Sequence, residues 1–188
     1  MPTPLAHALA GLIVHVATAP SDELASRRRA VVTVGAAVAP DLDFAWRLLD
    51  GVNHHQAQGH SIGVGLGLAV AVMLGAAAVQ VPRPWGLGLA ALGGWSSHLL
   101  LDLLNVDTSP PMGLMALWPF TDRYFKSPWP VFLDIGRTLN WRTVRHVTVA
   151  TAWELAILCP LLVAAWRGRA RSRAGAWNGA RVREQISG

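Results

Sequence analysis

The chain has 188 residues, a length typical of one domain, and 52% of them are hydrophobic while only 14% are charged. Soluble domains carry roughly a quarter charged residues, so this composition, with a mean hydropathy of +0.35, favours a polytopic membrane protein over a soluble one. The net charge of +5 comes from arginines, and the single cysteine, Cys159, excludes both a disulfide within the chain and a Cys-based zinc motif.

The N-terminal part of the chain contains two apolar stretches. Residues 5–19 end in a signal-peptide-like Ala-Thr-Ala, but no basic region precedes them, so we expect a retained helix. Residues 21–49 begin polar and turn apolar. Pro40 should break or kink this second segment, because proline lacks a backbone donor and clashes with the preceding turn. Asp41 and Asp43 follow that break.

Three longer apolar stretches follow. A helix needs about 20 apolar residues to span a bilayer. Residues 61–81 meet this requirement without a charge, and residues 148–166 meet it with one, Glu154. Residues 86–105 are a third candidate. The predicted fold is therefore an all-α membrane bundle of about five transmembrane helices within residues 1–166.

Two segments are predicted to lie outside the bilayer. Residues 106–147 are rich in Pro and Trp and read as a long extramembrane loop with short helices. Residues 167–188 are rich in Arg, Gly and Ala, and we expect a disordered basic tail. The tail directly follows an apolar span, so its charge favours a topology signal over a site for nucleic acid or anionic lipid.

The arginines suggest an orientation for five spans. With the tail in the cytoplasm, alternation places the three arginines at 27–29 and Arg83 inside as well. The inside segments then hold ten basic residues and the outside segments six, most of them in the long loop, where charge counts weakly. This arrangement predicts a multi-pass membrane protein with its basic tail in the cytoplasm.

Histidines and aspartates are expected to gather toward the outer side of this membrane protein. In the five-span arrangement, the start of the first span, the C-terminal ends of the second and fourth spans, and the loop before the third span all face outward. They carry His7, Asp41, Asp43, His54, His55, His60, His98 and Asp102. Ionisable groups within membrane segments are costly and usually functional, so we expect one shared site.

The chemistry of these residues indicates a metal site. His98 and Asp102 are four residues apart, on one face of a helix, and could bind one metal together. Imidazole and carboxylate ligands suit zinc, with manganese or iron as alternatives. Each element also has a simpler explanation: the His98–Asp102 pair as a structural hydrogen bond, the aspartates after Pro40 as a helix cap, and His54 and His55 as loop residues facing water.

The order of these motifs resembles a known family. "PTPLAHALAG", "APDLDF", "HHQAQGHSI", "SHLLLDLLN" and "GLMALWPF" follow one another as in the YdjM-like family of bacterial inner-membrane, metal-dependent hydrolases. The resemblance covers roughly residues 1–125. A more distant similarity is to zinc-dependent phospholipases C, although Glu154 has no histidine four residues before it, unlike the HxxxE motif of those enzymes.

The resemblance implies a ligand set. His7 matches the early histidine of the family, Asp41 and Asp43 match a PDxD segment, and the HxxxD motif falls on His98 and Asp102. The family's HxxxxHS motif falls on His55 and His60, with "QAQG" between them where the family usually has an arginine and a threonine. The implied metal ligands are His7, Asp41, His55, His60, His98 and Asp102.

Two functions are compatible with such a site. The first is a membrane-bound metal-dependent hydrolase that cuts an ester or phosphoester bond of a lipid or lipid-linked substrate, with Asp43 or Asp41 as general base. The second is a non-catalytic metal-binding scaffold, a transporter or a regulator that acts through the arginine tail. A transporter should place its ligands near mid-membrane, whereas these gather toward one side. The expected partners are the bilayer and a lipid-like substrate, and not nucleic acid.

Overall fold

The computed structural model describes residues 1–24, 26–51, 56–108, 110–135 and 140–187, with side chains except at 46–48, 50 and 173–187. This part of the chain is all-helical and contains no strand, which agrees with the predicted fold class. The α-helices are α1 (Pro4–Thr18), α2 (Arg27–Val38), α3 (Asp43–Asp50), α4 (Ile62–Ala78), α5 (Pro84–Leu103) and α6 (Trp141–Ser187). Two 3₁₀ turns, η1 (Ala39–Leu42) and η2 (Gln58–His60), flank α3 and α4.

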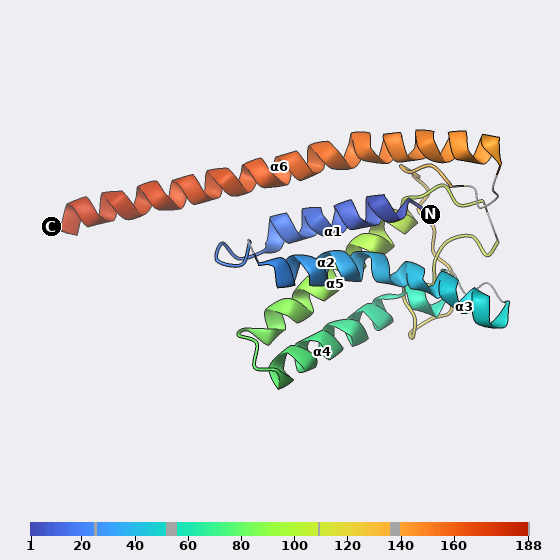
Figure 1. Cartoon of the computed structure of the whole chain (residues 1–188), viewed down its shortest axis with the longest axis horizontal. Coiled ribbons are helices and arrows are strands. Elements are labelled where there is room, and N and C mark those ends of the chain that lie inside the picture. The colour runs from blue at the N-terminus through green and yellow to red at the C-terminus, as the bar shows by residue number, and fades with distance from the viewer. Residues whose placement is uncertain (25, 52–55, 109, 136–139, 188) are drawn as a thin grey trace.

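Helix α5 lies at the centre of the bundle, packed against α1, α2 and α4, and α6 runs along α1 (Figure 1). Small residues allow these close contacts. A Cβ atom at Gly94 would lie 2.1 Å from the Thr33 carbonyl oxygen of α2, and one at Gly65 would lie 2.4 Å from the Trp95 ring. The glycines of α4 and α5 therefore bring the helix backbones together, as small residues do in membrane bundles.

Pro40 ends α2, as the sequence predicts. The helix stops at Val38, and residues 39–42 continue as the 3₁₀ turn η1 before α3 begins at Asp43. Proline cannot donate the backbone hydrogen bond that a continuing helix requires. The break turns the chain at one end of the bundle and leaves Asp41 in the turn and Asp43 at the start of the next helix.

Helix α6 is held to the start of α1 by a buried carboxylate. Glu154 accepts hydrogen bonds from the backbone nitrogen and the hydroxyl of Thr3, the residue that caps α1, and it is 1% exposed. Because the backbone N–H groups at a helix start have no partner within the helix, this contact satisfies one of them. It also fixes the first turn of α1, next to His7.

Two expectations about the C-terminal third differ from the structure. The described part of residues 104–140 contains no helix, so the short helices expected in the 106–147 loop are not there, and α6 begins at Trp141, inside the expected loop. Five prolines in the described part of this loop explain the lack of helix. The tail expected to be disordered continues α6 to Ser187, in keeping with its alanines and arginines, which are good helix formers.

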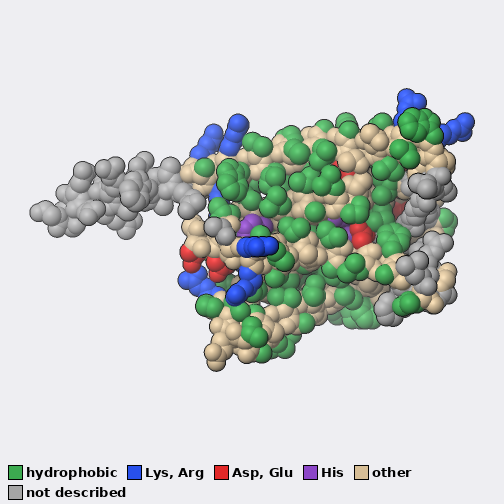
Figure 2. All heavy atoms as spheres, viewed as in Figure 1, with side chains coloured by type: hydrophobic (Ala, Val, Ile, Leu, Met, Phe, Trp, Pro, Cys, Tyr) green, Lys and Arg blue, Asp and Glu red, His purple; other side chains and the backbone are tan. Residues whose placement is uncertain are grey.

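The surface of the bundle is apolar over much of its length. Within the described residues, one helical stretch, Trp141–Ser172, is long and apolar enough to cross a membrane by itself. Helices α1 and α4 are apolar but have only 15 and 17 residues, and α2 has 12, so the five predicted spans are not confirmed. Hydrophobic side chains cover the middle of the face shown in Figure 2, while Lys and Arg side chains gather toward its ends.

Candidate metal centre

Five polar side chains meet in the interior, at the end of the bundle where α1 begins and α5 ends. His7 comes from the second turn of α1, Asp41 from η1 and His60 from the last position of η2. His98 and Asp102 come from the last two turns of α5. We call these five residues the His/Asp cluster. Segments up to 95 residues apart in the sequence are thus joined by one group of polar atoms.

Short distances connect the members of the His/Asp cluster. The Nε2 atom of His98 lies 3.1 Å from a carboxylate oxygen of Asp102 and 3.7 Å from one of Asp41. The Nε2 atom of His60 lies 3.6 Å from Asp102 and 3.8 Å from Asp41, and that of His7 lies 3.5 Å from Asp102. In each of two triads, His7–His98–Asp102 and Asp41–His60–His98, one ligand atom per residue lies within 4.8 Å of the others.

The far edges of two imidazole rings are held by groups outside the cluster. The Nδ1 atom of His98 lies 2.8 Å from the carbonyl oxygen of Ala37 in α2, to which it donates. The Nδ1 atom of His60 lies 3.0 Å from a carboxylate oxygen of Asp43. A histidine that donates from one ring nitrogen presents the lone pair of the other, and metal-binding histidines are commonly oriented in this way. Both Nε2 atoms consequently point into the cluster.

The cluster is buried and carries two carboxylates. The side chains of His7, His60, His98 and Asp102 are fully buried, and that of Asp41 is 9% exposed. In the described part of the chain, both oxygens of Asp41 and of Asp102 and the Nε2 of His98 lack a partner with hydrogen-bond geometry. Buried charges are stable only when they are paired or bind a cation. This donor set of imidazoles and carboxylates, without sulfur, fits a divalent transition metal.

The titration of His60 reflects the surplus of negative charge around it. Burial lowers the pKa of its imidazole, but the nearby carboxylates of Asp41 and Asp43, together with the charge of Asp102, outweigh burial and raise the pKa to about 9. Without a cation, the carboxylates therefore favour a protonated His60 at neutral pH. Metal binding requires the neutral ring, so loading the site should release this proton and should be weakened by acid.

The structure brings five of the sequence-predicted site residues close to one another, namely His7, Asp41, His60, His98 and Asp102. Asp43 does not face the cluster but lies at the opposite edge of the His60 ring. His55 and its neighbour His54 lie outside the described residues.

Sequence reasoning missed the supporting contacts of the cluster. The contact between His98 and the Ala37 carbonyl could not be predicted, because every residue carries a backbone carbonyl. The bond from Thr3 to Glu154 joins residues 151 positions apart, and only the presence of a lone acid in an apolar span hinted at it. The other two histidines belong elsewhere: buried His15 lies 3.0 Å from the Leu24 carbonyl through Nε2, and His146 lies against the Asp134 carbonyl.

Removing one cluster histidine should release the metal, whereas removing a comparable histidine elsewhere should not. We expect the detergent-purified protein to hold about one zinc ion per chain, and His60→Ala or His98→Ala to lose most of it. His15→Ala is the matched control, because His15 is also buried in the bundle but lies outside the cluster. Metal analysis by plasma mass spectrometry measures this. Metal-free wild-type protein from a chelator-free preparation would contradict the site.

Comparisons with known proteins agree with the membrane character of the bundle. The YdjM inner membrane protein family matches residues 1–174, a range that contains the whole His/Asp cluster and the apolar part of α6. No curated protein and no solved structure matches the chain. Since the family match covers most of the sequence, from the first residue to beyond the candidate span, the chain belongs to the YdjM inner membrane protein family.

Proposed function

We propose that this protein is a metal-dependent hydrolase of the bacterial inner membrane. The observation that carries the proposal is the convergence of three imidazoles and two carboxylates in a buried site. The Nδ1 atoms of His60 and His98 contact groups outside the cluster, and these contacts orient the two rings. A structural ion pair would need fewer groups. A divalent cation held by this set would lower the pKa of a bound water molecule toward neutrality, which is the usual basis of hydrolysis by such sites.

The two aspartates of the Pro40 turn have different roles in this proposal. Asp41 lies within 4 Å of both His60 and His98 through one carboxylate oxygen, which suits a metal ligand. Asp43 contacts the opposite nitrogen of His60, which suits an orienting group that keeps the proton on Nδ1 and the lone pair on Nε2. The general base is then either the free oxygen of Asp41 or Asp43 after release from His60.

A lipid-like substrate follows from the location of the site in a membrane protein. We propose a multi-pass topology with the arginine-rich end of α6 in the cytoplasm, which places the His/Asp cluster near the outer face. Exposed apolar side chains flank the bundle on α4, α5 and α6, among them Leu74, Leu100 and Leu161. A substrate with acyl chains would reach the cluster from the bilayer, and we propose that its ester or phosphoester bond is cut.

Charge removal at two aspartates should separate metal binding from catalysis. Asp102→Asn removes a negative charge from the centre of the cluster, so both metal content and activity should fall. Asp43→Asn should keep most of the metal but lose about 100-fold or more of the rate, because it disturbs only the orientation or the proton of His60. Metal content and turnover of a panel of phospholipids, phosphoesters and carboxyl esters measure the two effects.

Asp122→Asn is the control for this pair, since Asp122 is exposed in the loop outside the bundle. Metal retention by the wild type without turnover of any substrate would favour a non-catalytic scaffold. Loss of metal in Asp43→Asn would make Asp43 a ligand and overturn the division of roles.

Cysteine labelling tests the proposed orientation. In a Cys159→Ser background, Asp122→Cys in the loop should react with an impermeant thiol reagent in intact cells, and Ser172→Cys at the end of the candidate span in α6 should be protected. Both positions are exposed on the protein, so a difference in labelling reports the side of the membrane. Labelling of residue 172 but not 122 would invert the topology and move the cluster to the cytoplasmic face.

A further inference from the structure

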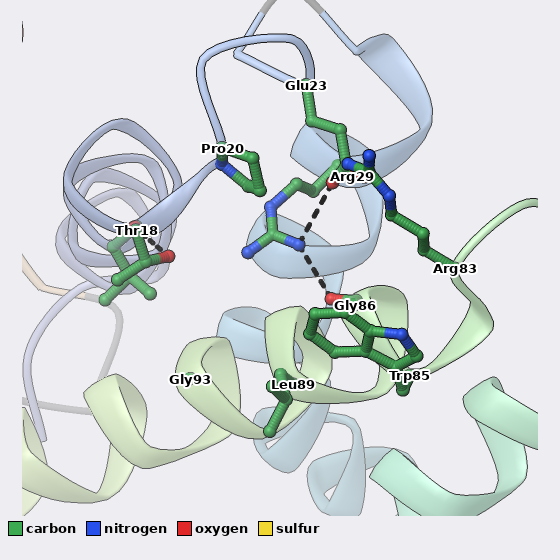
Figure 3. Close-up of a pocket in the computed structure, with 10 residues that line it drawn as sticks. Thr18, Pro20, Glu23, Arg29, Arg83, Trp85, Gly86, Leu89 and Gly93 are labelled. Carbon is green, nitrogen blue, oxygen red and sulfur yellow. Dashed lines mark hydrogen bonds and ion pairs between the residues drawn. The ribbon is translucent and has the colours of Figure 1, made fainter.

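A second polar feature lies at the other end of the bundle. A cavity of about 410 Å³ opens where α1 ends and α5 begins (Figure 3). This is within the size range of small-ligand sites, ~300–1,000 Å³. Its lining combines the charged side chains of Glu23, Arg29 and Arg83 with the apolar side chains of Val14, Trp85 and Leu89. None of these residues belongs to the His/Asp cluster.

Arg29 is the buried cation of this cavity. The residue is 5% exposed although it stands in the "RRR" run, whose other members, Arg27 and Arg28, face outward. Its Nη1 atom donates to the carbonyl oxygen of Gly86 at 2.7 Å and contacts Glu23 at 3.4 Å. Both contacts are drawn in Figure 3, where the guanidinium lies between Pro20 and Gly86. An arginine held in this way has a fixed position in the cavity and is not a mobile surface charge.

One edge of the Arg29 guanidinium takes part in neither of these contacts. Both recorded contacts use Nη1, and the buried Nε has no hydrogen-bond partner in the described part of the chain. Nε and Nη2 together form the edge that binds two oxygens of one carboxylate or phosphate group. A buried donor without a partner is costly, so an oxyanion in the cavity would satisfy a group that the protein leaves unpaired.

We propose that this cavity binds the phosphate group of an anionic phospholipid. The phosphate would bridge to the Nε–Nη2 edge of Arg29, and Arg83 would supply a second positive charge at the rim, where it also pairs with Asp22 at 2.9 Å. The carboxylate of Glu23 is the opposing charge, and its 3.4 Å contact leaves the free edge of Arg29 unblocked. Glu23 also lies 4.0 Å from Arg83, so the two arginines of the lining face one carboxylate within it and that of Asp22 beside it.

The apolar wall of the cavity favours a lipid over a free anion. Trp85 and Leu89 lie one turn apart on α5, and each is 57% exposed, so they extend from the cavity onto the outer surface of the bundle. In a protein of the inner membrane, this surface adjoins acyl chains. Tryptophan is enriched at the headgroup level, and basic pockets between membrane helices are known lipid sites. A soluble phosphate would make no use of this wall.

The two sites are separated along the same helices. His7 and Thr18 lie about 17 Å apart along α1, and Gly86 and His98 about 18 Å apart along α5, at 1.5 Å per residue. In the proposed topology, the cavity therefore faces the cytoplasmic leaflet and the His/Asp cluster the outer one. The lipid site does not depend on the proposed hydrolase activity, and its test does not measure that activity.

Lipid-dependent thermal stability of the full-length protein in neutral detergent tests the proposal. Phosphatidylglycerol should raise the Tm saturably, whereas phosphatidylcholine with the same acyl chains, or inorganic phosphate alone, should not. Arg29→Lys keeps the positive charge but removes the paired N–H donors of the guanidinium. The apparent Kd for phosphatidylglycerol should therefore rise by about tenfold or more. Arg27→Gln removes an exposed charge from the same helix and should cause only a smaller loss that salt abolishes.

A second variant covers the case in which Arg29→Lys does not fold. Thr18→Trp leaves Arg29 in place and fills part of the cavity from α1, so it should also weaken phosphatidylglycerol binding. Wild-type affinity in either folded variant would overturn the proposal, as would equal stabilisation by the two lipids. Equal protection by inorganic phosphate would identify a site for a soluble anion instead of a lipid.

Discussion

Two carboxylates are buried among three imidazoles, and this burial governs how four segments of the bundle, α1, η1, η2 and α5, must meet. Asp41 and Asp102 lie away from water, and their charge must be balanced within the protein. They come together where α2 stops before Pro40, where α5 ends just beyond Asp102, and where α1 begins. The close packing of α5 against α2 at Gly94 and the anchoring of Thr3 by Glu154 maintain these positions.

This arrangement gives the cluster a rigid support on several sides. The α2 backbone orients His98 through the Ala37 carbonyl, α3 orients His60 through Asp43, and α6 fixes the first turn of α1 ahead of His7. Four of the five cluster residues have no exposed side-chain surface. A site prepared in this way loses little free energy to reorganisation when a cation binds, and it presents a defined set of ligand atoms rather than a flexible loop.

The parts of this account that sequence predicted are those encoded locally. The four-residue spacing of His98 and Asp102 places both on one face of α5, and Pro40 sets the end of α2, since each effect depends on neighbours in the chain. The different orientations of Asp41 and Asp43 required knowledge that the first lies in a 3₁₀ turn and the second starts a helix.

Contacts between segments far apart in the chain could hardly be predicted from the sequence. Arg29 is indistinguishable in sequence from Arg27 and Arg28, and a run of three arginines indicated only membrane topology. Its burial depends on the position of the Gly86 carbonyl, 57 residues away. The composition of the C-terminal segment is typical of disorder, whereas in the structure α6 continues through it, since its alanines and arginines also suit a helix.

X-ray absorption spectroscopy of the purified, metal-loaded protein shows directly whether the His/Asp cluster holds one metal. We expect a shell of nitrogen and oxygen ligands at about 2.0–2.2 Å, with the scattering pattern of two or three imidazoles and without sulfur. Substitution of His98 by alanine should reduce the imidazole contribution. A shell of oxygens alone, or one containing sulfur from Cys159, would contradict metal binding by the His/Asp cluster.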